Sequence, residues 1–135
     1  MNRKDGRALA KSTLEDLDLF DLVESHEPET FGGAAFAIVH SKSLGMLQDA
    51  RDDFSGPAEI WVAIYVRRPA DGGAATEDTL DDLVRAAMRA LWAVFYETAA
   101  NLTIGPSEAG YPPKPIDGKP YRMERFAVRF SDDED

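Results

Sequence analysis

Cysteine is absent from this 135-residue chain. Without thiols the chain has no disulfide framework, no thiolate metal ligand and no cysteine nucleophile, which fits a reducing compartment. Only two histidines are present, and neither belongs to a zinc-binding or metalloprotease motif. The sequence therefore predicts no metal and no cofactor.

Long apolar runs are also missing, although 44% of the residues are hydrophobic. No run approaches the roughly 18–20 residues that span a bilayer, so we expect no membrane partner. The first eleven residues are basic, but no apolar segment follows them, so they do not resemble a secretory signal.

Positive charge is scarce, with 15 Lys and Arg against 25 Asp and Glu and a formal charge of −10. Such a balance argues against sequence-independent binding to nucleic acid, which needs cations to neutralise phosphates. The length suits about one domain. We predict a single domain over residues 1–131 and an acidic, solvated tail at 132–135.

Catalytic and nucleotide-binding motifs are missing as well. The spacing of Gly105 and Gly110 matches the start of a phosphate-binding loop, but Tyr111 and Pro112 replace the required Lys and Ser/Thr, and Pro106 removes an N–H donor. No serine, histidine and acid follow a known nucleophile motif. We therefore predict that the protein is not an enzyme.

The most regular pattern in the chain lies between Thr76 and Asn101, where large apolar residues recur at helical spacing. Thr76 and Thr79 are candidate N-caps, acidic residues follow them as the helix dipole favours, and Asn101 is a candidate end. The residues that form this stripe are Leu80, Leu83, Val84, Met88, Leu91, Trp92 and Phe95. A looser stripe predicts a short helix from Arg7 to about Asp16.

Three segments predict strands, at Ala34–His40, Ala58–Arg68 and Lys119–Phe130, and a short one is expected at Leu102–Ile104. Residues 17–26 fit either a strand or a continuation of the first helix. The sequence thus predicts an α/β (α+β) fold with a small mixed or antiparallel sheet of about four to five strands. One long helix at about 78–99 and the short N-terminal helix would pack on it.

Both faces of the Ala58–Arg68 segment are apolar, which indicates that both are covered. The long helix would cover one face, and the first helix, a folded-back loop or another subunit the other. In the closing segment Tyr121 and Met123 have the opposite parity to the inward set that ends at Phe130, which suggests a bulge near Glu124. Residues 105–118 are expected to be irregular.

Two groups of residues are candidates for an interface. The long connection from Ser41 to Gly56 carries apolar residues that could contact a partner or fold back onto the core; these are Leu44, Met46, Leu47 and Phe54. A set of arginines on two predicted strands could be solvent-facing charges paired with local acids or an interface strip; these are Arg67, Arg68, Arg122, Arg125 and Arg129.

The order of features along the chain resembles that of tail-terminator proteins from long-tailed, non-contractile bacteriophages, especially those of actinobacterial hosts. The resemblance runs through Val23–Pro28, the Ala34–His40 and Ala58–Arg68 strands, Gly110-Tyr111, and Asp117–Arg122 before the last strand. It implies a small α/β subunit that assembles with itself into a ring, typically of six, on the head-proximal end of the tail tube.

In that family the ring stops tube polymerisation and offers a surface to the neck and head-completion proteins, while DNA passes through its lumen without specific binding. The resemblance thus implies a virion protein that is present in the host cytoplasm during assembly. A closed ring needs two different surfaces on each subunit. The apolar residues of the 41–56 connection and the face with Arg125 and Arg129 are the predicted pair.

The sequence is also compatible with two other functions. A neighbouring neck or connector protein of the same particle could share the same small α/β plan. An acidic DNA-mimic inhibitor would need carboxylates spaced along one surface, whereas here they cluster at the helix start, in a loop and in the tail.

Overall fold

The computed structural model describes residues 1–25, 33–41, 56–69, 73–112 and 118–132, without the side chains of residues 56, 57 and 132. It contains two helices and a five-stranded mixed sheet, which confirms the predicted α+β class. The helices are α1 (Arg3–Asp16) and α3 (Ala74–Thr98). The strands are β1 (Leu22–Glu24), β2 (Ala35–Ser41), β3 (Gly56–Arg67), β4 (Thr103–Gly110) and β5 (Tyr121–Asp132).

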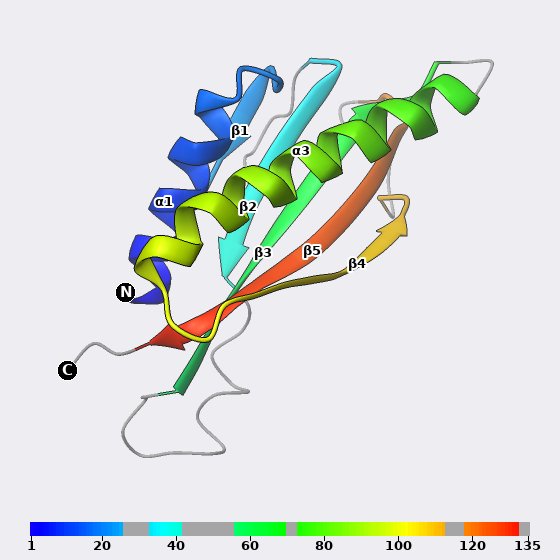
Figure 1. The fold of residues 1–135 in the computed structure, drawn as a ribbon. Coiled ribbons are helices and arrows are strands. Elements are labelled where there is room, and N and C mark those ends of the chain that lie inside the picture. The colour runs from blue at the N-terminus through cyan, green and yellow to red at the C-terminus, as the bar shows by residue number, and fades with distance from the viewer. Residues whose placement is uncertain (26–32, 42–55, 70–72, 113–117, 133–135) are drawn as a thin grey trace.

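The strand order across the sheet is β1-β2-β3-β5-β4 (Figure 1). β1 pairs with β2 in parallel, and all the other pairings are antiparallel. β3 and β5 form the centre and pair without interruption from Gly56 with Asp132 to Arg67 with Tyr121. The prediction of a bulge near Glu124 is therefore wrong. The register shift lies in β4 instead, between Ile104 and Ser107.

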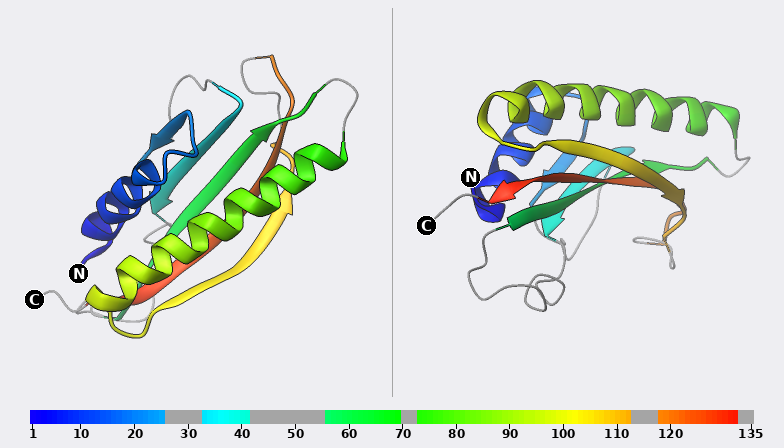
Figure 2. Two further views of the ribbon diagram at one scale, coloured as in Figure 1. Left: turned by 45° about the horizontal axis from the view of Figure 1, so that its top comes forward. Right: turned by 60° about the horizontal axis from the view of Figure 1, so that its bottom comes forward.

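Both helices lie on the same face of the sheet (Figure 2). α1 packs over β1 and β2, and α3 crosses β3 and β5. The main core between the two layers contains, among others, Leu14, Val39, Ile60, Val62, Ile64, Leu80, Leu91, Phe95, Phe126, Val128 and Phe130. The first helix therefore does not cover the second face. Neither described helix is long and apolar enough to cross a membrane.

The face opposite the helices has its own aromatic cluster, on which no helix of the described residues lies. Phe36 is fully buried and stacks on Tyr65 with a centroid distance of 4.7 Å. Tyr121 meets Phe36 edge-on at 5.2 Å, and its hydroxyl donates a hydrogen bond to the Gly33 carbonyl at 3.0 Å. Tyr121 and Met123 thus belong to this face, which explains their parity without a bulge.

The start of α3 differs from the prediction. Gly73 is the N-cap and makes no side-chain cap hydrogen bond. Thr76 is instead the third residue of the helix and is buried, with 6% of its surface exposed. Thr79 also lies inside the helix. Gly73 has a φ of +132°, a backbone conformation that glycine adopts without steric cost, so the chain can turn into α3 at this residue.

The end of α3 comes before Asn101. The N–H of Ala99 donates to the Phe95 carbonyl at 2.8 Å and closes the last turn. Asn101 has a φ of +56°, and its side-chain amide donates to the Ser131 hydroxyl at 2.7 Å. Asn101 therefore marks the turn after the helix, where it ties the chain to the end of β5.

β4 is longer than the short strand predicted, so the prediction that 105–118 is wholly irregular is wrong for its first part. Pairing with β5 holds at Thr103 and Ile104, shifts, and resumes from Ser107 to Gly110. Proline cannot donate to a ladder and is tolerated at edge strands and bulges. Pro106 lies within the register shift of an edge strand, which is why it does not end the strand.

Candidate interface surfaces

The predicted arginine strip is divided between the two faces of the sheet. Arg125 and Arg129 lie on the helix-free face, since they alternate with the core residues of β5. Arg122 lies on the helix face, opposite the core residue Val66. Arg67 pairs opposite Tyr121 and shares the helix-free face. The strands are neighbours, as predicted, but the arginines do not form one continuous strip.

Arg125 and Arg129 both have acidic partners within the chain. The Arg129 Nε lies 3.2 Å from Glu59 Oε1, and the Arg125 Nη2 lies 3.4 Å from Glu108 Oε1. The Arg125 guanidinium also lies over the Trp61 ring, 4.5 Å from its centroid. These contacts fit the alternative of solvent-facing charges paired with local acids. A role for Arg125 and Arg129 in a subunit contact remains a prediction.

Arg122 joins α3, β4 and β5 at one end of the sheet. Its Nε donates to Glu77 Oε1 at 2.7 Å, and its Nη1 donates to the Gly110 carbonyl. The ring of Tyr111 contacts two cations, with Arg122 at 4.6 Å and Arg68 at 5.0 Å from its centroid. Arg68 and Arg122 thus both pack against the exposed ring of Tyr111. Arg122 also links the start of α3 to the sheet through Glu77.

The hydrogen bond to Glu77 is the main cause that raises the pKa of Arg122 above its ordinary value. A raised pKa means that the cation is more stable in the folded state than in the unfolded one. Its contribution is fully present below the pKa of the unfolded state and is lost only as pH rises through the higher pKa of the folded state. We therefore expect no loss of stability from deprotonation of Arg122 at physiological pH.

Replacing Arg122 by methionine is expected to lower the free energy of unfolding by about 1–2 kcal/mol. The substitution leaves the Gly110 carbonyl without its donor and removes a charge-assisted hydrogen bond, although half-exposed Glu77 can be solvated. Urea unfolding measures the change. Lys11→Met is the control, because its pair with Glu15 is exposed and should change stability by under about 0.5 kcal/mol. Equal losses in the two variants would contradict the prediction.

The four apolar residues of the long connection, Leu44, Met46, Leu47 and Phe54, lie outside the described residues. Residues 133–135 of the predicted acidic tail lie outside them too. The assignment of the connection to a partner surface stays a prediction.

An exposed aromatic pair on α3 is the surface feature that sequence reasoning missed. Trp92, which the periodic stripe assigned to the core, is 46% exposed, and Tyr96 is 69% exposed. Their rings stack with centroids 5.8 Å apart. Neighbouring helical residues point about 100° apart, so Leu91 and Trp92 cannot both point directly at the sheet. Leu91 is fully buried, and Trp92 lies at the edge of the stripe.

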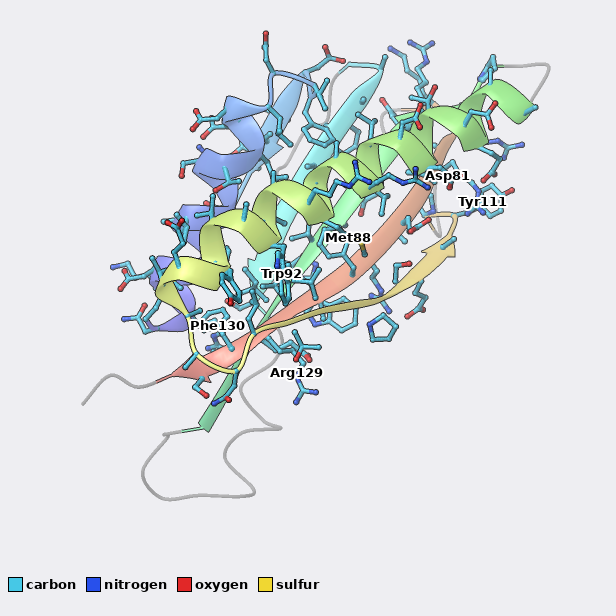
Figure 3. All side chains as sticks on the ribbon, viewed as in Figure 1. Asp81, Met88, Trp92, Tyr111, Arg129 and Phe130 are labelled. Carbon is cyan, nitrogen blue, oxygen red and sulfur yellow. The ribbon has the colours of Figure 1, made fainter. Side chains whose placement is uncertain are left out.

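A groove lies along the side of α3 that faces β4 and β5. Its lining residue Met88 is one helical turn before Trp92 (Figure 3). The volume of the groove is about 330 Å³, and its walls carry charges of both signs beside the apolar Val84 and Met88. The lining residues are Asp81, Val84, Arg85, Met88 and Arg89 of α3, Ser107 of β4 and Glu124 of β5. Within the described part of the chain, no group of histidines and acids could hold a metal ion.

Comparison with known proteins adds no family to this description. A scan against models of protein families finds no match to the chain, and a search of curated proteins finds none either. The functional proposal must therefore rest on the surfaces of the fold and on the resemblance in the sequence.

Proposed function

We propose that this protein is a structural virion protein that forms a ring, of about six copies, on the head-proximal end of a phage tail tube. The ring ends tube polymerisation and forms the junction to the neck and head-completion proteins. Its partners are other copies of itself, the tube protein and the neck protein. DNA passes through the lumen without specific binding, and the subunits assemble in the host cytoplasm.

The exposed aromatic pair on α3 carries this proposal. Trp92 and Tyr96 are the largest exposed apolar side chains on a rigid helix of 25 residues. Tryptophan and tyrosine are enriched in the buried centres of protein interfaces and dominate their binding energy. The stacked pair is exposed on a helix that also lines a groove. This observation supports a function that depends on contacts between subunits.

The resemblance to tail-terminator proteins supports a ring on the tail tube as the kind of assembly. The strand, loop, strand, helix and last-strand order on which it rests corresponds to β2, β3, α3 and β5. Gly110 ends β4, and Tyr121 begins β5. The acidic balance of −10 suits a passage through which DNA must move without being retained.

The test is to measure the mass of the purified protein by light scattering over a range of protein and magnesium concentrations, with negative-stain images of the same samples. We expect closed rings of about six subunits, as a heterologous contact permits. The same protein added to purified tail tubes should cap one end and stop further growth. Binding to head portals in place of tubes would favour a connector role.

A chain that stays monomeric under all these conditions and leaves tube ends free would contradict the proposal. Assembly into open fibres would contradict it too, because a terminator must close.

A further inference from the structure

The two edges of the sheet carry surfaces of different chemistry. β4 forms one edge and β1 the other (Figure 1). Beside the β4 edge, the outer side of α3 carries Arg85, Met88, Arg89, Trp92 and Tyr96, which we name the aromatic flank. Arg85 and Arg89 are exposed, and within the part of the chain that the structure describes neither forms an ion pair. The aromatic flank thus combines exposed rings with unpaired positive charge.

Beside the β1 edge lies a turn of the opposite character. We name residues 15–21 the acidic turn; they comprise the last two residues of α1 and the connection to β1. Leu19 is 46% exposed at its centre. Asp16 and Asp18, which precede Leu19, are exposed and form no ion pair with any described residue. Asp21 has a structural role, because its Oδ2 accepts the N–H of Ala34 at 2.7 Å.

We infer that the aromatic flank of one copy binds the acidic turn of the next copy. Arg85 and Arg89 match Asp16 and Asp18 in charge, and Leu19 is an apolar residue of a size that packs against aromatic rings. Complementary potentials guide association and exclude wrong partners. The inference rests on the proposed ring and names the two surfaces that join its subunits.

The positions of the two surfaces fit a ring rather than a dimer. The flank lies on the β4 side of α3 and the turn lies beside β1, so the two surfaces differ and each contact leaves a free flank and a free turn at the two ends of the assembly. Such a heterologous contact forms a ring when the rotation between successive copies closes, and an open filament when it does not. Arg125 and Arg129 fit this role less well, because their charges already have partners in Glu108 and Glu59.

Two variants, one with altered charges on each surface, test the inference by light scattering and negative-stain imaging of the full chain. The flank variant is Arg85→Glu with Arg89→Glu, and the turn variant is Asp16→Lys with Asp18→Asn. Asparagine is chosen because residue 18 has a φ of +55°, which asparagine tolerates. Each variant alone is expected to associate about 100-fold more weakly than the wild type, because like charges then face each other. An equimolar mixture of the two should regain assembly.

The control variant is Arg67→Glu, at an exposed position on the helix-free face that belongs to neither surface, which should assemble as the wild type does. Equal midpoints of urea unfolding would show that all variants are folded. Wild-type assembly that survives in both the flank variant and the turn variant overturns the inference and leaves the proposed ring standing. Loss in the flank variant alone, with no rescue in the mixture, also overturns it and indicates another protein as the occupant. Rescue of an assembly that is open rather than closed supports the inference and contradicts the proposed function.

Discussion

Replacing Phe95 by alanine is expected to lower the free energy of unfolding by about 3–5 kcal/mol. Phe95 is fully buried on α3, and its ring lies 5.6 Å from that of Phe130 on β5. Truncation removes apolar contacts and leaves a cavity between the helix layer and a central strand, where the backbone cannot collapse to fill it. Since domains are stable by only about 5–15 kcal/mol, much of the total would be lost.

The neighbouring variant Tyr96→Ala is the matched control for this prediction. Tyr96 is 69% exposed on the same turn of α3, so its loss should change the stability of the monomer by under about 0.5 kcal/mol. Urea unfolding at a concentration where the protein is monomeric measures both variants. Similar losses in Phe95→Ala and Tyr96→Ala would show that the packing of α3 on the sheet is not as described.

Replacing Gly33 by alanine is expected to cost about 2–4 kcal/mol, from an unfavourable backbone conformation and a steric clash together. Gly33 has a φ of +91°, and an added Cβ would lie 2.5 Å from the Cβ of Asp21. A shift of Asp21 would break its hydrogen bonds to the N–H groups of Ala34 and Ala35, and the Gly33 carbonyl also accepts the Tyr121 hydroxyl. Faster hydrogen exchange at the Ala34 amide would report the local opening.

Gly118→Ala separates the two causes. Gly118 has a φ of +72°, but an added Cβ would meet nothing within 4 Å. Only the backbone conformation is then unfavourable, and the expected loss is about 1 kcal/mol. A loss in Gly33→Ala no larger than in Gly118→Ala would mean that Asp21 moves aside without cost.

The faces of the strands could be predicted from the sequence because alternation in a strand has a period of two and needs no tertiary information. Ile60, Val62 and Ile64 lie in the main core, and Trp61 and Tyr65 on the other face, as the pattern indicates. Residues 17–26 could not be assigned, because a strand of three residues has too few positions to show a period.

The predictions that the structure contradicts concern segments whose sequence fits more than one local pattern. Trp92 satisfies helical spacing as well as Leu91 does, and only the position of the sheet beneath α3 decides which one is buried. Thr76 has the chemistry of a cap, but it is buried three residues into a helix that begins after a glycine. The parity of Tyr121 and Met123 suggested a bulge because the sequence alone did not show that β5 also contributes side chains to the second apolar face of the sheet.

The candidate surfaces could be predicted only in part. Spacing placed the arginines on neighbouring strands, but the acidic partners of the three arginines on β5 come from three different elements. Glu59 is on β3, Glu77 on α3 and Glu108 on β4. The stacked pair of Trp92 and Tyr96 follows the four-residue spacing at which helical side chains meet, and that spacing was the signal that could have identified it.

The position of β5 between β3 and β4 has a consequence for synthesis. A ribosome adds roughly 5–20 residues per second from the N-terminus, and β5 follows every other described strand and both helices in the chain. Until Phe126, Val128 and Phe130 have been made, the nascent polypeptide lacks a central strand, and α3 has only part of the core to pack on. Pairing partners so distant in sequence form slowly. Newly made subunits would therefore expose apolar surface for longer than a protein built from local hairpins, and chaperones would bind them at this stage.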